Sequence, residues 1–125
     1  MNIKFYKLKK YDDLRGSLIE IIREDNIDNK ISQVYISYSN KGAIRGGHYH
    51  KRKTEWFTII KGKANFYFKD LLINQEKFEI FSDNDLILIE VKPYVYHKIE
   101  SLTDDMILFV AVNEVYDEKD NDTFN

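Results

Sequence analysis

All three histidines of the chain share one spaced pattern with a glutamate. The histidines are His48, His50 and His97, and the glutamate is Glu55. Imidazole nitrogens and a carboxylate oxygen form a donor set that suits a divalent transition ion such as zinc, iron(II), manganese or nickel. Because the chain has no cysteine, any such ion must be held by nitrogen and oxygen. These four side chains are therefore the predicted metal ligands, and zinc is the predicted ion.

The spacing of the four residues fits short strands. Side chains two positions apart project from the same face of a strand, so His48 and His50 point the same way where that segment is extended. Glu55 opens an apolar segment that is predicted to be a strand, and His97 lies within another. Three strands of one barrel would thus direct three imidazoles and one carboxylate toward a common point.

The rest of the chain also consists of short segments rich in Ile, Val, Phe and Tyr, separated by turn-forming residues. The predicted strands are Ile3–Lys9, Ser17–Ile22, Ser32–Tyr38, Ile44–His50, Glu55–Lys61, Lys63–Lys69, Lys77–Ile80, Leu86–Glu90, Tyr94–Glu100 and Met106–Val112. This series predicts an all-β antiparallel sandwich or barrel. We expect one helical turn within Arg23–Asn29, and a polar tail after Tyr116 that frays.

Length and composition narrow the possible partners. A chain of 125 residues predicts a single domain spanning 1–125. Its start does not resemble a secretion signal and no run approaches ~18 apolar residues, so we expect a cytoplasmic protein without a membrane partner. The net charge is −2 and basic residues are scattered, which argues against a nucleic-acid partner. The densest basic run, Lys51 to Lys53, is interpreted as a solvated turn, or alternatively as a contact for a small anionic ligand.

The glycines around the histidine pattern give it a family resemblance. The segment resembles the first sequence motif of the cupins at every anchor position, which are Gly42, His48, His50, Glu55 and Gly62. The second cupin motif is matched at His97. Three neighbouring positions depart from it, with Lys92, Tyr94 and Ser101 where cupins usually have proline, glycine and asparagine. The resemblance implies a jelly roll, that is, a double-stranded β-helix.

A narrower resemblance covers almost the whole chain. The segments Asp13–Glu20 and Ile44–Tyr49 resemble the opening signature and the catalytic-histidine segment of the dTDP-4-dehydrorhamnose 3,5-epimerase-like cupins. The ending, 113–118 with 122–124, resembles the C-terminal cupin of capsular-polysaccharide reductase/epimerase enzymes and is similar to the sugar-nucleotide 3,4-ketoisomerases. Glu55 departs from the ketoisomerases and His50 from the epimerases, and both departures favour the metal-binding, capsule-type branch.

The resemblance implies an isomerase that acts as a homodimer on a nucleotide-linked 4-keto-6-deoxyhexose, with dTDP or UDP as the nucleotide, in surface polysaccharide and deoxysugar biosynthesis. Removal of the acidified proton at C3 gives an enolate. Return of the proton to the other face is a 3-epimerisation, our first expectation, and protonation elsewhere is a 3,4-ketoisomerisation. The alternatives are a non-catalytic cupin that binds sugar nucleotides and a metal-dependent cupin dioxygenase.

The resemblance also implies site residues. It makes His48 the base, Tyr116 the candidate acid, and Arg15 and Glu20 contacts to the nucleotide. An arginine pairs bidentately with phosphate, so a diphosphate partner is expected for Arg15 or Arg45.

Gln33, on the strand before the motif, is a candidate hydrogen-bond partner of the sugar.

The two roles predicted for His48, metal ligand and base, conflict, because a lone pair that ligates a metal cannot take a proton. Either the metal polarises the 4-keto oxygen and another group is the base, or the metal is structural.

Overall fold

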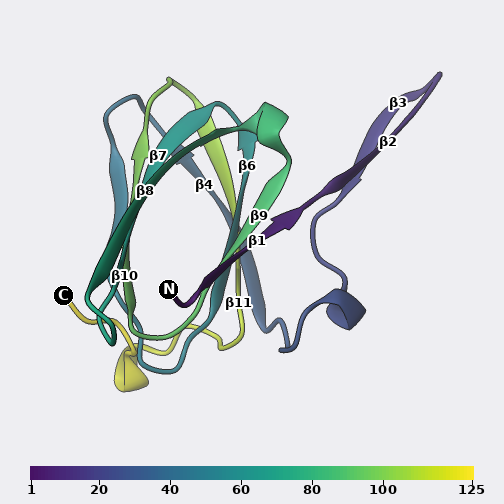
Figure 1. The fold of residues 1–125 in the computed structure, drawn as a ribbon. Coiled ribbons are helices and arrows are strands. Elements are labelled where there is room, and N and C mark those ends of the chain that lie inside the picture. The colour runs from purple at the N-terminus through teal and green to yellow at the C-terminus, as the bar shows by residue number, and fades with distance from the viewer.

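Two antiparallel β-sheets face each other and a third, two-stranded element projects away from them (Figure 1). The computed structural model describes residues 1–125. One sheet has the strand order β1 (Ile3–Lys7), β9 (Ile87–Val91), β6 (Glu55–Lys61), β11 (Met106–Val112) and β4 (Gln33–Ser39). The other has the order β5 (Ile44–His48), β10 (Val95–Ser101), β7 (Lys63–Asp70) and β8 (Gln75–Ser82). The projecting hairpin is β2 (Lys9–Asp13) and β3 (Gly16–Glu20).

Alternating burial along the strands forms the core between the two sheets. In β7, Ala64, Phe66 and Phe68 point inward and are buried, while the residues between them are partly exposed. β10 alternates in the same way and brings His97 into this interior. Burying one large apolar side chain contributes roughly 1.5–3 kcal/mol, so these strands are strongly held in register.

The strand β6 is buried on both faces from Glu55 to Ile59, which explains why apolar residues occupy adjacent positions in it instead of alternating with polar ones. Phe57 and Ile59 belong to the core between the sheets. Trp56, on the opposite face, packs with Leu88 and Ala111 in a second cluster, which residues of the segment 21–31 cover. The strand that carries Glu55 is therefore fixed from both sides.

The predicted all-β jelly roll is confirmed, and the predicted strands β6 and β11 have the expected bounds. The other predicted strands overlap observed ones. β2 is the strand that the sequence did not predict, because its residues are mostly charged and all exposed, so hydrophobic patterning gave no signal. The helical turn expected within Arg23–Asn29 is a 3₁₀ turn, η1 (Glu24–Asn26).

The expectation that the tail frays is wrong. The tail contains a 3₁₀ turn, η3 (Glu118–Asp120), then Asp122, which is 1% exposed, and Phe124, which forms an antiparallel bridge with Tyr49. A third 3₁₀ turn, η2 (Asp83–Asp85), follows β8. None of the helical segments is long and apolar enough to cross a membrane.

Candidate active site

The four predicted ligands converge at one place between the two sheets. His48 ends β5, His50 follows it, His97 lies in the middle of β10, and Glu55 begins β6 in the facing sheet. One ligand atom from each residue lies within 4.8 Å of all the others. His50, Glu55 and His97 are buried and His48 is half-buried. The predicted convergence is confirmed, whereas the ligand roles stay predictions.

Hydrogen bonds turn two of the imidazoles toward Glu55. The Nδ1 of His50 donates to the main-chain oxygen of Asp122, and the Nδ1 of His97 donates to the main-chain oxygen of Val95 at 3.0 Å. Their Nε2 atoms both face Oε1 of Glu55, at 2.8 and 3.1 Å. In neutral rings with Nδ1 protonated, two nitrogen lone pairs would then face one carboxylate oxygen.

This arrangement fits a bound cation. Metal-ligating histidines in proteins almost always donate the other ring N–H to a carbonyl or carboxylate, as His50 and His97 do to main-chain oxygens. A cation among the converging lone pairs would relieve their repulsion, and three nitrogens with one oxygen are suitable donors for zinc. The residues present therefore fit a divalent metal.

Electrostatics shifts the pKa values of Glu55, His50 and His48. With no cation bound, burial opposes ionisation of Glu55, but the close approach of the His50 and His97 rings outweighs it and holds the pKa of this carboxyl well below its usual range. Burial alone would lower the pKa of His50, yet the hydrogen bond and charge of Glu55 raise it. Burial, helped by the neighbouring His97 and His50, lowers the pKa of His48 to about 4, so His48 is neutral at pH 7.

Backbone geometry aligns the histidines. His48 lies directly opposite His97 in the pairing of β5 with β10, and a register shift follows at Lys98. Gly46 has a φ of +79°, and a Cβ there would lie 2.8 Å from the main-chain oxygen of His97. A glycine is needed at this point because any other side chain would push the two strands apart.

A cavity of about 150 Å³ lies next to the cluster. His48, Glu55 and His97 line it together with Arg45 from β5, and Tyr35 and Ser37 from β4. The Oγ of Ser37 is buried and has no hydrogen-bond partner. Sequence reasoning missed Tyr35 and Ser37, although both share the strand face of Gln33 by the two-residue period.

Of the predicted substrate contacts, Arg45 lies at the cavity. Its Nε donates to Ser39 Oγ at 3.0 Å and its NH2 to the main-chain oxygen of Tyr38 at 2.6 Å. Gln33 does not line the cavity, because its Oε1 accepts the main-chain N–H of Tyr116 at 2.7 Å. Tyr116 is also outside the cavity lining, and it is 61% exposed.

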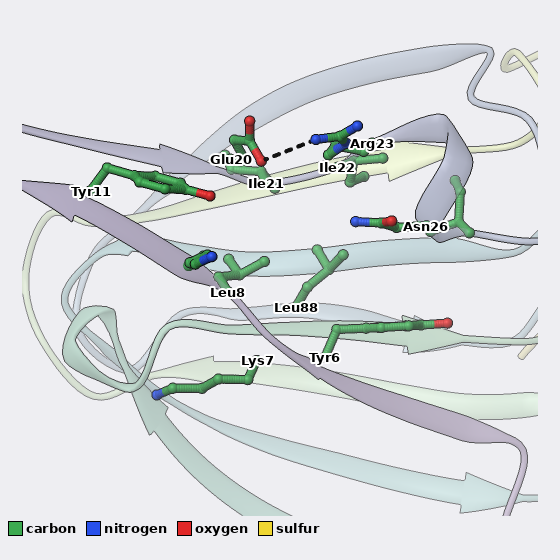
Figure 2. Close-up of a pocket in the computed structure, with 12 residues that line it drawn as sticks. Tyr6, Lys7, Leu8, Tyr11, Glu20, Ile21, Ile22, Arg23, Asn26 and Leu88 are labelled. Carbon is green, nitrogen blue, oxygen red and sulfur yellow. Dashed lines mark ion pairs between the residues drawn. The ribbon is translucent and has the colours of Figure 1, made fainter.

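Two other predicted contacts lie on the projecting hairpin, away from the histidines of the same chain (Figure 1). Arg15 is in the hairpin turn, where its NH2 pairs with Asp13 at 2.6 Å. Glu20 ends β3 and lines a separate groove at the base of the hairpin, where its carboxylate lies 3.9 Å from Arg23 (Figure 2).

The basic run 51–53 is only partly the solvated turn that was expected. Lys51 and Arg52 are exposed, but Lys53 is 7% exposed, and its ammonium lies 5.7 Å from the ring centroid of Tyr116. The interpretation of Lys53 as solvated is therefore wrong. Lys53 lies two residues before the buried strand β6, so it is buried with the start of that strand.

A jelly roll with three histidines and a carboxylate converging in its interior is the architecture of a cupin. Residues 11–124 match the model of the polysaccharide biosynthesis C-terminal domain, and the chain belongs to this family. The family resemblance found in the sequence is thus confirmed.

Known relatives of the chain include enzymes of nucleotide-sugar metabolism. It is 33% identical over 121 residues to UDP-2-acetamido-2,6-beta-L-arabino-hexul-4-ose reductase of Pseudomonas aeruginosa, a match that covers 95% of this chain and 31% of that protein. The chain therefore spans less than a third of this relative's length. It is 32% identical over 121 residues to TDP-4-oxo-6-deoxy-alpha-D-glucose-3,4-oxoisomerase of Aneurinibacillus thermoaerophilus, covering 96% of this chain and 85% of that one.

The fold is also shared with a solved structure. A sugar 3,4-ketoisomerase from Thermoanaerobacterium thermosaccharolyticum, crystallised in complex with TDP, superposes with a TM-score of 0.85 at 26% identity. The superposition covers 98% of this chain and 87% of that chain.

Proposed function

We propose that the chain is an isomerase acting at C3 of a nucleotide-linked 4-keto-6-deoxyhexose, by 3-epimerisation or 3,4-ketoisomerisation, in surface polysaccharide or deoxysugar biosynthesis. The nucleotide is dTDP or UDP. The observation that carries this proposal is the state of His48. It lines the cavity, its ring makes no hydrogen bond to the protein, and its lowered pKa keeps it neutral at pH 7.

A neutral, unpaired imidazole beside a cavity has a lone pair free to accept a proton, and the negative charge that develops on the adjacent enolate would raise its low pKa as the proton arrives. In the proposed reaction His48 takes the C3 proton, and the electron pair moves into the enolate of the 4-keto group. Return of a proton to the opposite face of C3 gives the epimer. Protonation at C4, with transfer of the proton from the C3 hydroxyl to the oxygen at C4, gives the 3-keto isomer. Both outcomes leave the atom count unchanged.

His50, Glu55 and His97 are the proposed residues for holding a divalent metal, with zinc as the first choice. A bound ion would supply positive charge close to the cavity, where negative charge develops on the enolate oxygen. With these three residues as ligands, His48 is free to act as the base, which resolves the conflict between its two predicted roles. The prediction that His48 is itself a fourth ligand is tested with the variants below.

Arg45, and Ser37 with its unpartnered hydroxyl, are the proposed substrate contacts within one chain. For Tyr116 to act as the acid, its exposed ring would have to turn toward the cavity when substrate binds. Gln33 would serve the sugar indirectly, by holding the main chain of Tyr116.

We also propose a homodimer in which the hairpin reaches a second copy. Every residue of β2 and β3 is exposed, and an isolated two-stranded hairpin is only marginally stable in water. β4 ends its sheet with one edge unpaired, and its sequence, Gln33–Ser39, contains no charge or proline that would discourage pairing with another chain. A partner's hairpin at this edge would bring Arg15 and Glu20 toward the cavity.

Incubation with dTDP- and UDP-linked 4-keto-6-deoxy sugars in heavy water, followed by NMR, tests the proposed reaction. We expect deuterium at C3, with an inverted centre or a 3-keto product identifying the outcome. A reaction without enzyme controls for spontaneous exchange. His48→Asn should lose exchange and retain metal if His48 is the base alone, and should lose both if it is also a ligand. Absence of exchange with every sugar would refute the proposal.

Three imidazoles and one carboxylate also suit iron(II), which keeps a cupin dioxygenase as the second candidate. Oxygen consumption that depends on added iron, without exchange at C3, would favour it. Tight binding of a nucleotide sugar with neither activity would instead identify a non-catalytic binding cupin.

A further inference from the structure

The residue Asp122 connects the tail to the loop that carries His50. Its carboxylate accepts three consecutive main-chain N–H groups, from Lys51 at 3.0 Å, Arg52 at 2.8 Å and Lys53 at 3.0 Å. Its own main-chain oxygen accepts Nδ1–H of His50 at 2.5 Å. One residue thus holds both the imidazole of His50 and the turn that follows it.

The contacts around Asp122 hold its main chain in place. Phe124 and Tyr49 exchange two main-chain hydrogen bonds, at 2.8 and 3.0 Å, which sets the tail in register beside the His50 loop. The Phe124 ring lies 5.6 Å from that of Tyr49, and the ammonium of Lys51 lies 4.2 Å from the Phe124 centroid. Asp122 is 1% exposed, so it is surrounded by other residues of the protein and not by solvent.

We propose that Asp122 is the positioning residue of the His50 imidazole, so that the tail completes the metal site. This inference rests on the metal centre of the proposed function. The Asp122 carbonyl keeps the proton on Nδ1 and leaves the Nε2 lone pair aimed at Glu55. Its carboxylate holds the turn 51–53, which links His50 to the start of β6. Without the Asp122 carboxylate, the tail loses its three hydrogen bonds to the turn 51–53, so the main-chain oxygen of residue 122 is no longer held opposite Nδ1 and the ring of His50 can rotate and present the wrong nitrogen.

Outer-shell partners of this kind typically contribute about 10- to 100-fold to metal affinity. Asp122→Ala should therefore raise the Kd for zinc by about 10- to 100-fold. Asp122→Asn, which keeps one oxygen acceptor for the turn, should give a smaller loss. Asp120→Ala is the matched control, because it removes the same charge from an exposed side chain whose partner is Arg52. This control should bind zinc like the original chain.

A second readout separates positioning from general stability and needs no metal. In the metal-free protein with ¹⁵N-labelled histidine, the Nδ1–H of His50 should give a slowly exchanging proton resonance. Asp122→Ala should lose the slow exchange of this resonance. The Nδ1–H of His97, bound to Val95, should be unchanged and serves as an internal reference.

The outcomes distinguish this inference from the proposed function. If the original chain binds no zinc, the proposed metal fails, while the resonances of the metal-free protein still test Asp122. If Asp122→Ala keeps both the zinc Kd and the slow exchange at His50, the positioning role is refuted. Equal loss of the His50 and His97 resonances would also refute it, since that pattern indicates general loosening. Should Asp122→Ala fail to fold, the same criteria apply to Asp122→Asn and Phe124→Ala.

Discussion

Two buried glutamates on paired strands show how the surroundings of a residue decide its use. Glu55 and Glu90 are 6% and 4% exposed, and their strands β6 and β9 are neighbours. Glu90 accepts the indole N–H of Trp56 at 3.0 Å, which is a structural contact. Glu55 instead faces two imidazoles in the interior. The same side chain type thus contacts an indole on one face of the sheet and two imidazoles on the other.

This contrast gives a paired test of the metal site. Glu55→Gln replaces a charged ligand with a neutral amide, so its zinc Kd should rise by at least the ~100-fold that loss of an outer partner can cost. Glu90→Gln keeps an oxygen for Trp56 and should leave the zinc Kd unchanged. Titration with zinc against a competing chelator measures both. Equal affinities for the two variants would contradict the assignment of Glu55.

The unpartnered hydroxyl of Ser37 predicts a trade between stability and binding. An unsatisfied buried polar group is costly, so Ser37→Ala should keep or slightly raise the melting temperature. A hydrogen bond to substrate is worth about 1 kcal/mol, so the same change should raise KM by about fivefold. Thermal unfolding and steady-state kinetics measure the two effects. An unchanged KM would exclude Ser37 from the substrate contacts.

At the scale of elements, the pairing of β5 with β10 brings His48 opposite His97. Gly46 allows these two strands to approach closely. Gly46 and Gly42 both have a positive φ, but a Cβ has different surroundings at the two positions. At Gly46 it would lie 2.8 Å from the His97 main chain, whereas at Gly42 nothing lies within 4 Å. Close approach of the strands is therefore specific to Gly46, while backbone strain is common to both.

Alanine at each glycine separates these two effects. Gly42→Ala should cost about 1–2 kcal/mol from the left-handed backbone alone. Gly46→Ala should cost more, and should also weaken zinc binding because His97 must shift. Chemical denaturation gives the free energies of unfolding, and zinc titration gives the affinity. If both variants kept the original zinc affinity, the contact between Gly46 and His97 would not control the site.

At the scale of the whole molecule, the candidate site joins the two sheets. Glu55 belongs to the five-stranded sheet, whereas His48 and His97 belong to the four-stranded sheet. A metal held among them would act as a cross-link across the interior. Binding to the folded state alone adds about 4 kcal/mol when the ion is present at roughly 1,000 times its Kd.

Removal of metal should therefore lower the melting temperature of the original chain. Loss of about 4 kcal/mol of stabilisation corresponds to a decrease of about 15 °C for a chain of this size. Calorimetry with zinc and with chelator measures it. Glu55→Gln provides the control, because its melting temperature should not respond to chelator. A response of equal size in this variant would show that the effect does not arise from the site.

The unpaired edge of β4 predicts how the molecule assembles. Ile36 is 50% exposed on this strand, and a charge at its position should oppose pairing with a second copy. Ile36→Lys is expected to sediment as a monomer and the original chain as a dimer. Ile60→Lys, at a residue of β6 that is 44% exposed, is the control and should remain a dimer. A monomeric original chain would refute the proposed dimer.

The sequence by itself determined the fold class, most of the strands and the four residues that converge between the sheets, because these depend on local spacing. Imidazoles two residues apart share a strand face, and alternating apolar residues define an inward side. β2 was missed, since its charged residues have no such alternation. Its hairpin holds Arg15 and Glu20, which the family resemblance makes nucleotide contacts and which the structure places apart from the histidines of the same chain.

Only the tertiary structure decided which residues distant in the sequence lie beside the histidines. Ser37 and Tyr35 enter the cavity because β4 flanks it. The tail is held in place because Asp122 accepts hydrogen bonds from the main-chain N–H groups of residues 51–53 and from the imidazole of His50, which are distant in the sequence. Such contacts depend on where the sheets and the tail come to lie. No periodicity in the sequence encodes that placement, so polar residues such as Asp122 resemble ordinary surface residues until the fold is known.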